Sequence, residues 1–442
     1  MDLDSTAGTV LIGGLTFALI GLIVFGVGRT RAVVVFGARE DAPWLFRAAG
    51  VRTQGVVVAY LGIVVAVAAL AFLLVSASFP DARSLAWTVS WVSAVVLLAL
   101  TMTRFARYVV HVATDGKGVM DEPTEADFVE PDDALDDVDV RSAREAALAG
   151  DWRPAAHLLS ATSDPDTRFA RLGVLATAAT RRGAWLDAWL REQPYDPHAL
   201  ALRAQVATLR AWEIRGGDWN PRHPERFLDA LADAEAYARE AIAVAPTDPS
   251  PHATLVTMAR GQQVDRDELD RRLAGLLALA PDHRQGHEQA LQYLAAKWFG
   301  SAEEMFSFAR ATSARAQEGS ALGLLVVVAH VEHTLMLSGR NTRLADKHMA
   351  SAETRAEIAA AERRWADGPG GPSPVGRSEA HNLLAYAWWL AEEPAAAQRH
   401  LAHTREHLSE WPWGYSGDPT EAHARAQVWG RTHASSKAAA AA

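Results

Sequence analysis

The sequence predicts an all-α protein with a membrane-spanning part at its N-terminal end and a larger helical part after it. Three long apolar segments without Asp, Glu, Lys or Arg stand in the first 103 residues of the 442-residue chain. From residue 141 onward the chain is rich in Ala and Leu, which favour helices, and shows no alternating strand pattern. These observations divide the chain into a membrane domain, residues 1–112, and a helical domain, residues 141–430.

The three apolar segments lie at about residues 10–28, 56–75 and 85–103. A helix rises about 1.5 Å per residue, so about 20 residues cross a hydrocarbon core about 30 Å thick. Only a helix satisfies all its backbone groups within such a segment. The first segment lacks the basic start of a signal peptide, since Asp2 and Asp4 precede it. We therefore expect three transmembrane helices that are retained.

The arginines around these segments predict their orientation, because short loops rich in Lys and Arg stay in the cytoplasm. The loop between the first two segments carries Arg29, Arg31, Arg39, Arg47 and Arg52, and Arg104 and Arg107 follow the third. This pattern places the N-terminus outside and the large helical domain in the cytoplasm. Few lysines beside many arginines and alanines indicate a bacterial protein, so we expect a multi-pass protein of the inner membrane, in contact with the lipid bilayer.

An acidic segment, residues 113–140, joins the two predicted domains. Ten acidic residues and no basic residue lie between positions 121 and 140, and the formal net charge of the whole chain is −10. Such a run repels itself and favours an extended, flexible linker. The alternative is a docking site for a basic partner. The helical domain has no basic stripe, which argues against nucleic-acid binding. The chain also has no cysteine, in keeping with a cytoplasmic domain.

Helix starts are marked clearly in the second half of the chain. Asp–Pro pairs at 164–165, 196–197, 248–249 and 418–419 each place an N-cap acceptor before a proline, which fits the first helical position. Ser301 and Glu304 form a capping-box pattern directly after Gly300, which predicts a tight turn between two helices. The last residues, 431–442, are of low complexity, and we expect a disordered tail there.

The turns recur at a regular spacing. Ala245-Pro246-Thr247-Asp248 and Ala280-Pro281-Asp282-His283 stand about 34 residues apart, with Pro194-Tyr195-Asp196-Pro197 as an earlier copy. The chain here resembles a tetratricopeptide-like array of helical hairpins, which implies an α-solenoid with a concave face that can bind a protein partner. The motif Lys297-Trp298-Phe299-Gly300-Ser301, followed by Met305, Phe308, Ala309 and Arg310, is similar to the signature of an uncharacterised bacterial family of such domains. That resemblance implies no assigned reaction.

One soluble segment, Leu322–Leu337, is apolar almost all round yet contains His330, Glu332 and His333. It is too short and too polar near its end to cross a membrane, so we expect the central core helix of the soluble domain. Its polar side chains need partners when buried. They form either a structural hydrogen-bond network or a pocket with Lys297 or Arg310 nearby. Candidate binding residues are therefore Lys297, Trp298, Ser301, Arg310, His330, Glu332, His333, and Trp219 in the loop Gly216–Pro224.

Catalytic and metal-binding patterns are weak. His403-Thr404-Arg405-Glu406-His407 matches the H-x-x-E-H string of inverted zinc peptidases, but little chain follows to supply a third ligand. His283 and His287 are four residues apart and share a helix face. No phosphate-binding loop or nucleophile elbow is present. We therefore expect no cofactor, no metal and no catalytic residue.

The sequence favours a membrane-anchored cytoplasmic scaffold that binds a protein partner. Two alternatives remain open: a membrane-tethered enzyme with a pocket around His330 and Glu332, and a subunit of a membrane transport or secretion assembly. Small residues on the first apolar segment, Gly13, Gly14, Ala18 and Gly21, would permit the close helix contacts of such an assembly.

Overall fold

The computed structural model describes residues 123–216, 223–368 and 371–441. The three predicted transmembrane segments and their orientation, together with Trp219, lie outside the described residues. Within the described part, one segment, Ala321–Ser338, is apolar and long enough to cross a membrane, with a mean hydropathy of 1.6. It is 72% buried inside the protein. As predicted from its polar residues, it forms a core helix of the domain.

The described residues form helices throughout, and no strand occurs among them. Three short 3-10 helices, η2, η3 and η4, span Glu125–Asp127, Ala321–Leu324 and Trp413–Ser416. The α-helices in chain order are α4 (Val138–Leu148), α5 (Arg153–Ala161), α6 (Pro165–Arg181), α7 (Ala184–Glu192), α8 (Pro197–Arg215), α9 (Pro224–Val244), α10 (Pro249–Ala259), α11 (Arg266–Leu279), α12 (Arg284–Leu294), α13 (Ala302–Arg315), α14 (Leu325–Ser338), α15 (Thr342–Ala350), α16 (Ala352–Ala366), α17 (Arg377–Leu390), α18 (Pro394–Thr404) and α19 (Pro419–Ala441).

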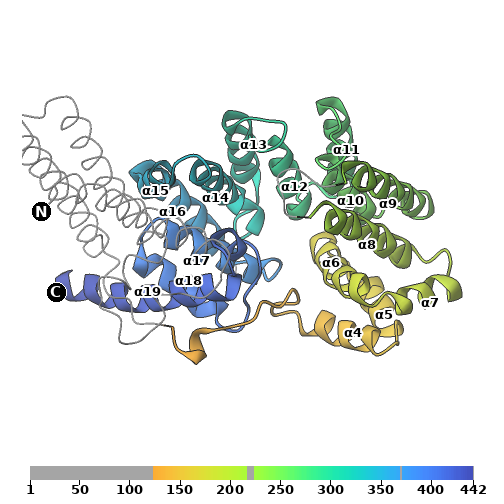
Figure 1. Ribbon diagram of the computed structural model, residues 1–442, viewed down its shortest axis with the longest axis horizontal. Helices are drawn as coiled ribbons and strands as arrows, with labels where there is room; N and C mark the ends of the chain where they lie inside the picture. The colour runs from red at the N-terminus through yellow and green to blue at the C-terminus, as the bar shows by residue number, and fades with distance from the viewer. Residues whose placement is uncertain (1–122, 217–222, 369–370, 442) are drawn as a thin grey trace, which may run out of the picture. The chain divides into compact units, whose positions relative to one another are not determined.

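Consecutive helices pair as hairpins, and the hairpins stack in chain order (Figure 1). The pairs α8–α9, α10–α11 and α17–α18 pack closely along their lengths. The first helices of successive pairs also touch, since α6 packs on α8, α8 on α10, α10 on α12, and α12 on α14. In addition, α6 contacts α10 and α12 directly, so this row of helices curves strongly. The arrangement agrees with the predicted solenoid-like packing of helical pairs.

The predicted helix starts are confirmed. Asp164, Asp196 and Asp248 each accept a hydrogen bond from a backbone N–H in the first turn of the helix that follows. Ser301 caps α13 by accepting from the Glu304 N–H at 3.1 Å. Gly300 is required at this corner, because a Cβ there would lie 2.1 Å from the carbonyl oxygen of Leu294.

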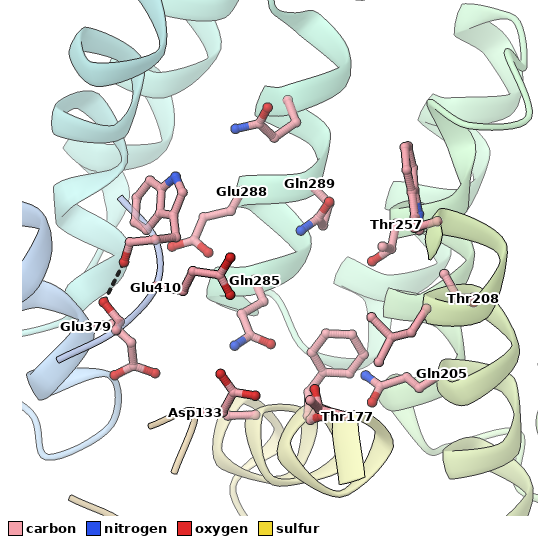
Figure 2. A pocket seen from close by; sticks show the side chains of 18 of the residues that line it. Asp133, Thr177, Gln205, Thr208, Thr257, Gln285, Glu288, Gln289, Glu379 and Glu410 are labelled. Carbon is pink, nitrogen blue, oxygen red and sulfur yellow. Dashed lines mark hydrogen bonds between the residues drawn. The ribbon is translucent and has the colours of Figure 1, made fainter. Parts of the chain in front are cut away.

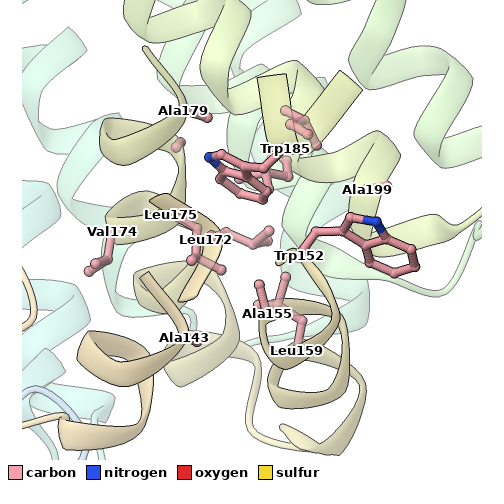
Figure 3. Packing of buried hydrophobic residues seen from close by; sticks show 14 of the residues in the cluster. Ala143, Trp152, Ala155, Leu159, Leu172, Val174, Leu175, Ala179, Trp185 and Ala199 are labelled. Atoms are coloured by element: carbon pink, nitrogen blue, oxygen red, sulfur yellow. The ribbon is translucent and has the colours of Figure 1, made fainter. Parts of the chain in front are cut away.

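Tryptophan forms much of the core at the N-terminal end of the array (Figure 3). Trp152 stacks on Trp189 with ring centroids 5.3 Å apart, and both are buried among the alanines and leucines of α5 to α8. Trp185, Trp388 and Trp413 are also buried. Burying a large aromatic side chain removes much apolar surface from water. These tryptophans therefore serve the core of the domain.

The prediction of a flexible acidic linker is wrong for residues 123–140. Asp132 binds Arg141 and Arg144 of α4 at 2.9 and 2.6 Å, and Asp127 binds Arg431 of α19 at 2.7 Å. The Asp132 backbone N–H donates to the carbonyl of Leu408 at 3.0 Å. Acidic residues repel one another only while no cations face them, and here arginines of the folded domain do. The segment therefore joins the first and last parts of the helical array.

The predicted disordered tail, residues 431–442, is also corrected for its described part, because α19 continues to Ala441. Alanine has the highest intrinsic helix propensity, so the Ala-rich end can extend a helix that is already started by Pro419.

Candidate functional site

A cavity of ≈670 Å³ lies on the concave side of the curved row of helices. Its walls come from α6, α8, α10 and α12, from the corner at Trp298, and from the segment between Ser409 and Tyr415. Asp133 and Leu135 of the N-terminal segment line it as well. The cavity therefore uses residues from both ends of the described domain, and its size is typical of sites for small ligands or short peptide segments.

Amide and hydroxyl side chains form much of the cavity wall. Gln285, Gln289 and Gln292 recur along one face of α12, and Gln205 faces the cavity from α8. A side-chain amide offers both a hydrogen-bond donor and an acceptor. This stripe of glutamines is polar where the inner helices of a packed array would otherwise be apolar.

Carboxylates gather on one side of the cavity. In Figure 2, Glu288, Glu379 and Glu410 lie together on one side, whereas Thr257 of α10 lies on the opposite side. Arg284 on the acidic side binds Glu288 at 2.8 Å and Glu379 at 3.4 Å. Burial raises the pKa of Glu288 above its usual value, even though Arg284 opposes that shift. The acidic side therefore has more carboxylates than cations.

Lys297 and Glu332 form an ion pair at the cavity wall, with Nζ and Oε2 2.5 Å apart. Glu332 is fully buried, and its other oxygen accepts from Gln292 at 2.7 Å and from the Tyr415 hydroxyl at 2.6 Å. Burial and the negative charge of Glu332 both raise the pKa of Tyr415, so this hydroxyl stays protonated and donates. The carboxylate thus has three donors, which satisfies its buried charge.

Arg260 lies directly after α10 and lines the cavity. Its guanidinium carbon is 4.8 Å from the ring centroid of Trp212 and 5.9 Å from that of Trp298. It donates a hydrogen bond to Gln289. Burial lowers the pKa of Arg260 to about 10, which leaves it a cation at neutral pH.

The predicted binding residues separate into three places. Lys297 and Trp298 line the cavity, and Glu332 reaches it through Lys297. Ser301 caps α13 and lies outside the cavity lining.

Arg310, His330 and His333 form a different group. Arg310 binds Glu357 at 2.7 Å, and His330 binds the same carboxylate at 3.0 Å. The ring of His333 packs edge-on against His348, with centroids 4.8 Å apart.

A single pocket containing both His330 and Glu332 is therefore a wrong prediction. Each residue of an α-helix turns about 100°, so two residues separated by two positions face nearly opposite sides. His330 faces α15 and α16, where its Nδ1 lies 3.0 Å from Nε2 of His348. Glu332 faces α12 and the Tyr415 segment. The two buried groups belong to separate hydrogen-bond networks.

Two histidine clusters flank α16. The first contains His330, His333 and His348, whose rings pack together, and His330 binds Glu357 of α16. In the second, Glu362 of α16 accepts from His400 at 3.1 Å, and His381 lies 3.0 Å from His400 through their Nδ1 atoms. His381 also stacks on His403, with centroids 3.9 Å apart.

These clusters also account for the H-x-x-E-H string. His403 stacks on His381, while the His407 carbonyl accepts a hydrogen bond from Asn382. Across the described ranges, no group of three or more His, Cys, Asp or Glu side chains is arranged to hold a metal ion.

Sequence reasoning missed Arg260, Glu288 and Glu379, because they come from different hairpins and share no local motif. One signal was present in the sequence. Gln285, Gln289 and Gln292 are spaced four and three residues apart, which places polar amides on one face of a single helix. Since α12 is packed between neighbours, such a stripe indicates an internal polar surface.

Comparison with protein-family models, with curated proteins and with solved structures finds no match to this chain.

Proposed function

We propose that the helical domain is a binding module that takes up a polypeptide segment of a protein partner in the central cavity. The predicted transmembrane helices would hold this module at the cytoplasmic face of the bacterial inner membrane, where it acts as a scaffold. The tetratricopeptide-like resemblance of the sequence motivates the same proposal, because stacked helical hairpins present a concave face to their partners.

The glutamine-lined wall is the observation that carries this proposal. An extended polypeptide presents backbone N–H donors and C=O acceptors at regular intervals, and each buried one needs a partner. Gln289 already accepts from Arg260, and Gln292 donates to Glu332. Each amide has two N–H donors and two lone pairs, so Gln285, Gln289 and Gln292 still offer both kinds of group along one line of the cavity. Such a lining pairs with peptide backbone irrespective of its side chains, while the charged groups at the two sides select among sequences.

The geometry gives less support to the enzyme alternative. That alternative relied on one pocket built from His330 and Glu332, which face opposite sides of α14. Each of them is held by neighbouring side chains, as a structural network requires. The alternative of a transport or secretion subunit depends on residues 1–112, which lie outside the described part.

Gly173 of α6 allows a direct test, because it lines the cavity and a Cβ built there meets nothing within 4 Å. Gly173→Phe would place a ring in the cavity, and replacing glycine within a helix also removes an unfavourable helix residue. Gly173→Ala is the matched control, since it makes the same backbone change without filling the cavity.

The experiment is crosslinking in intact cells followed by purification of the full-length chain from detergent. We expect wild type and Gly173→Ala to recover the same partner and Gly173→Phe to lose it, with melting temperatures at or above that of wild type. If Gly173→Phe remains folded and still captures that partner, the cavity is not the binding site.

A further inference from the structure

Arg260 is held in a fixed position by the backbone that follows it. A Cβ at Gly261 would lie 2.8 Å from Leu231 Cδ1, 2.9 Å from Phe227 Cζ and 3.2 Å from Trp212 Cζ2. The chain therefore passes against the α8–α9 hairpin with no room for a side chain at position 261. This close packing fixes the direction in which Arg260 leaves the end of α10 toward the cavity.

The guanidinium of Arg260 faces the cavity without a carboxylate partner. Among the described residues, no Asp or Glu oxygen lies within 4 Å of its nitrogens, in contrast to Arg284 on the acidic side of the cavity. Of its five N–H donors, the contact to Gln289 uses one. The two tryptophan rings lie near the guanidinium without supplying a hydrogen-bond acceptor.

The surroundings of Arg260 are rich in positive charge. Arg215 approaches the same two rings, at 5.7 Å from the centroid of Trp212 and 5.4 Å from that of Trp298. Lys297 lies on the same wall, next to Trp298, but its charge is matched by Glu332. That carboxylate already accepts from three donors and makes no hydrogen bond to Arg260, so its charge acts on the guanidinium only through space.

We propose that Arg260 is the anchor for an oxyanion of a ligand bound in the cavity, a carboxylate or a phosphate group. The planar guanidinium donates two parallel hydrogen bonds to either group. Trp212 and Trp298 fix its plane through cation–π contacts and exclude water around it. Glu288, Glu379 and Glu410, which gather on another part of the cavity wall, repel an anion, and this repulsion directs the negative end of the ligand to Arg260.

The anion site rests on the proposed function, which identifies the ligand as a polypeptide segment of a protein partner. The carboxylate would then be a side chain or a free C-terminus of the bound segment, whereas phosphate would indicate a phosphorylated segment or a free phosphate compound. N-acetylglycine and inorganic phosphate represent these two sources, and N-acetylglycinamide is the uncharged control.

The experiment measures the melting temperature of the full-length chain in detergent while each probe is titrated at constant ionic strength with NaCl. The variants are Arg260→Gln and the matched control Arg266→Gln, whose half-exposed side chain is paired with Asp270 and Glu304 outside the cavity. A ligand that binds only the folded state raises the melting temperature.

We expect N-acetylglycine, phosphate or both to stabilise wild type and Arg266→Gln, while N-acetylglycinamide does not. Arg260→Gln should bind the active anion at least about tenfold more weakly, and it should melt at or above the wild-type temperature, since it removes an uncompensated charge. The stronger of the two anions identifies the source of the oxyanion.

Two results would overturn the inference. One is the absence of any anion effect on wild type beyond that of NaCl. The other is an equal response of Arg260→Gln and wild type. A lower melting temperature of Arg260→Gln, together with no anion effect on wild type, would show that the arginine only packs on the tryptophans. Loss of the anion response in Arg260→Gln, combined with partner capture by Gly173→Phe, would refute the proposed function and leave the anion site in place.

Discussion

Replacing Glu332 with Gln should destabilise the protein strongly, because Glu332 is the charge that compensates Lys297 at the cavity wall. Glu332 is fully buried and the Lys297 side chain is 16% exposed, so solvent screens this pair little. The amide of glutamine is neutral, and its N–H₂ group must face either the donors of Gln292 and Tyr415 or the donor of Lys297. Removing one partner of a buried ion pair costs about 3–5 kcal/mol.

The expected change in melting temperature follows from that free energy. For domains of 150–250 residues, 1 kcal/mol corresponds to a shift of about 2–4 °C, and the described domain is larger. At about 2 °C per kcal/mol, the melting temperature of Glu332→Gln should fall by roughly 6–10 °C, measured by calorimetry on the full-length chain. Glu303→Gln, at an exposed site in the first turn of α13, is the control and should change stability by less than about 0.5 kcal/mol.

A double-mutant cycle completes this test. Lys297→Met should lower the free energy of unfolding less in the Glu332→Leu background than in wild type. The two apolar side chains of the double mutant leave no unpaired charge. A Glu332→Gln variant that stays within about 1 kcal/mol of wild type would refute the reasoning. Partner capture below the melting temperature should persist in Glu332→Gln, since a structural role affects stability and leaves the partner's contacts in place.

Two further predictions concern acid stability and topology. Burial and neighbouring histidines lower the pKa of His348 to about 4 and that of His381 to about 3, from 6.5. Since the unfolded chain takes up these protons first, the two groups leave stability intact above pH 6.5 and reduce it as pH falls toward about 4. In thermal melts, the stability of a His348→Gln/His381→Gln variant should fall less between pH 7 and 5 than that of wild type or of the exposed-site control His157→Gln. An equal dependence of melting temperature on pH in all three would contradict the assignment of this effect to the two histidines. A reporter that works only in the cytoplasm should be active when fused after Ala442, and a reporter that works only outside should be active at the N-terminus; the reverse pattern would exclude a cytoplasmic scaffold.

Local features of the fold were predictable from the sequence. An Asp before a Pro specifies a helix start through contacts within four residues, so Asp164, Asp196 and Asp248 cap the helices that they were expected to cap. The apolar segment around Val328 is buried because no face of it is polar enough for water. Both inferences depend on neighbours in sequence alone.

The site was less predictable, because it depends on which hairpins meet. Lys297 and Trp298 were selected from a local motif and do line the cavity, whereas Arg260 and Glu379 come from other hairpins. The separation of His330 from Glu332 follows from the geometry of one helix. The order of the acidic segment could not be predicted, because Asp127 pairs with Arg431, which lies some three hundred residues further along the chain.

The contact between the first and last described segments changes how the domain should fold. In an open stack of hairpins each repeat touches only its neighbours, so unfolding can start at a terminal repeat and spread inward. Here η2 packs against α19, and Asp132 is bonded to Leu408, which leaves neither end of the array as an independent terminus.

The entropy cost of bringing η2 and α19 together is moderate despite the length of chain between them, because the cost of loop closure grows only logarithmically, by about 0.6 kcal/mol for each doubling of length. The contact between η2 and α19 can form only after α19 has been synthesised, so a nascent chain lacks it until then. Once it has formed, amide hydrogens at both ends of the domain should exchange through the same global opening, and the array behaves as one cooperative unit.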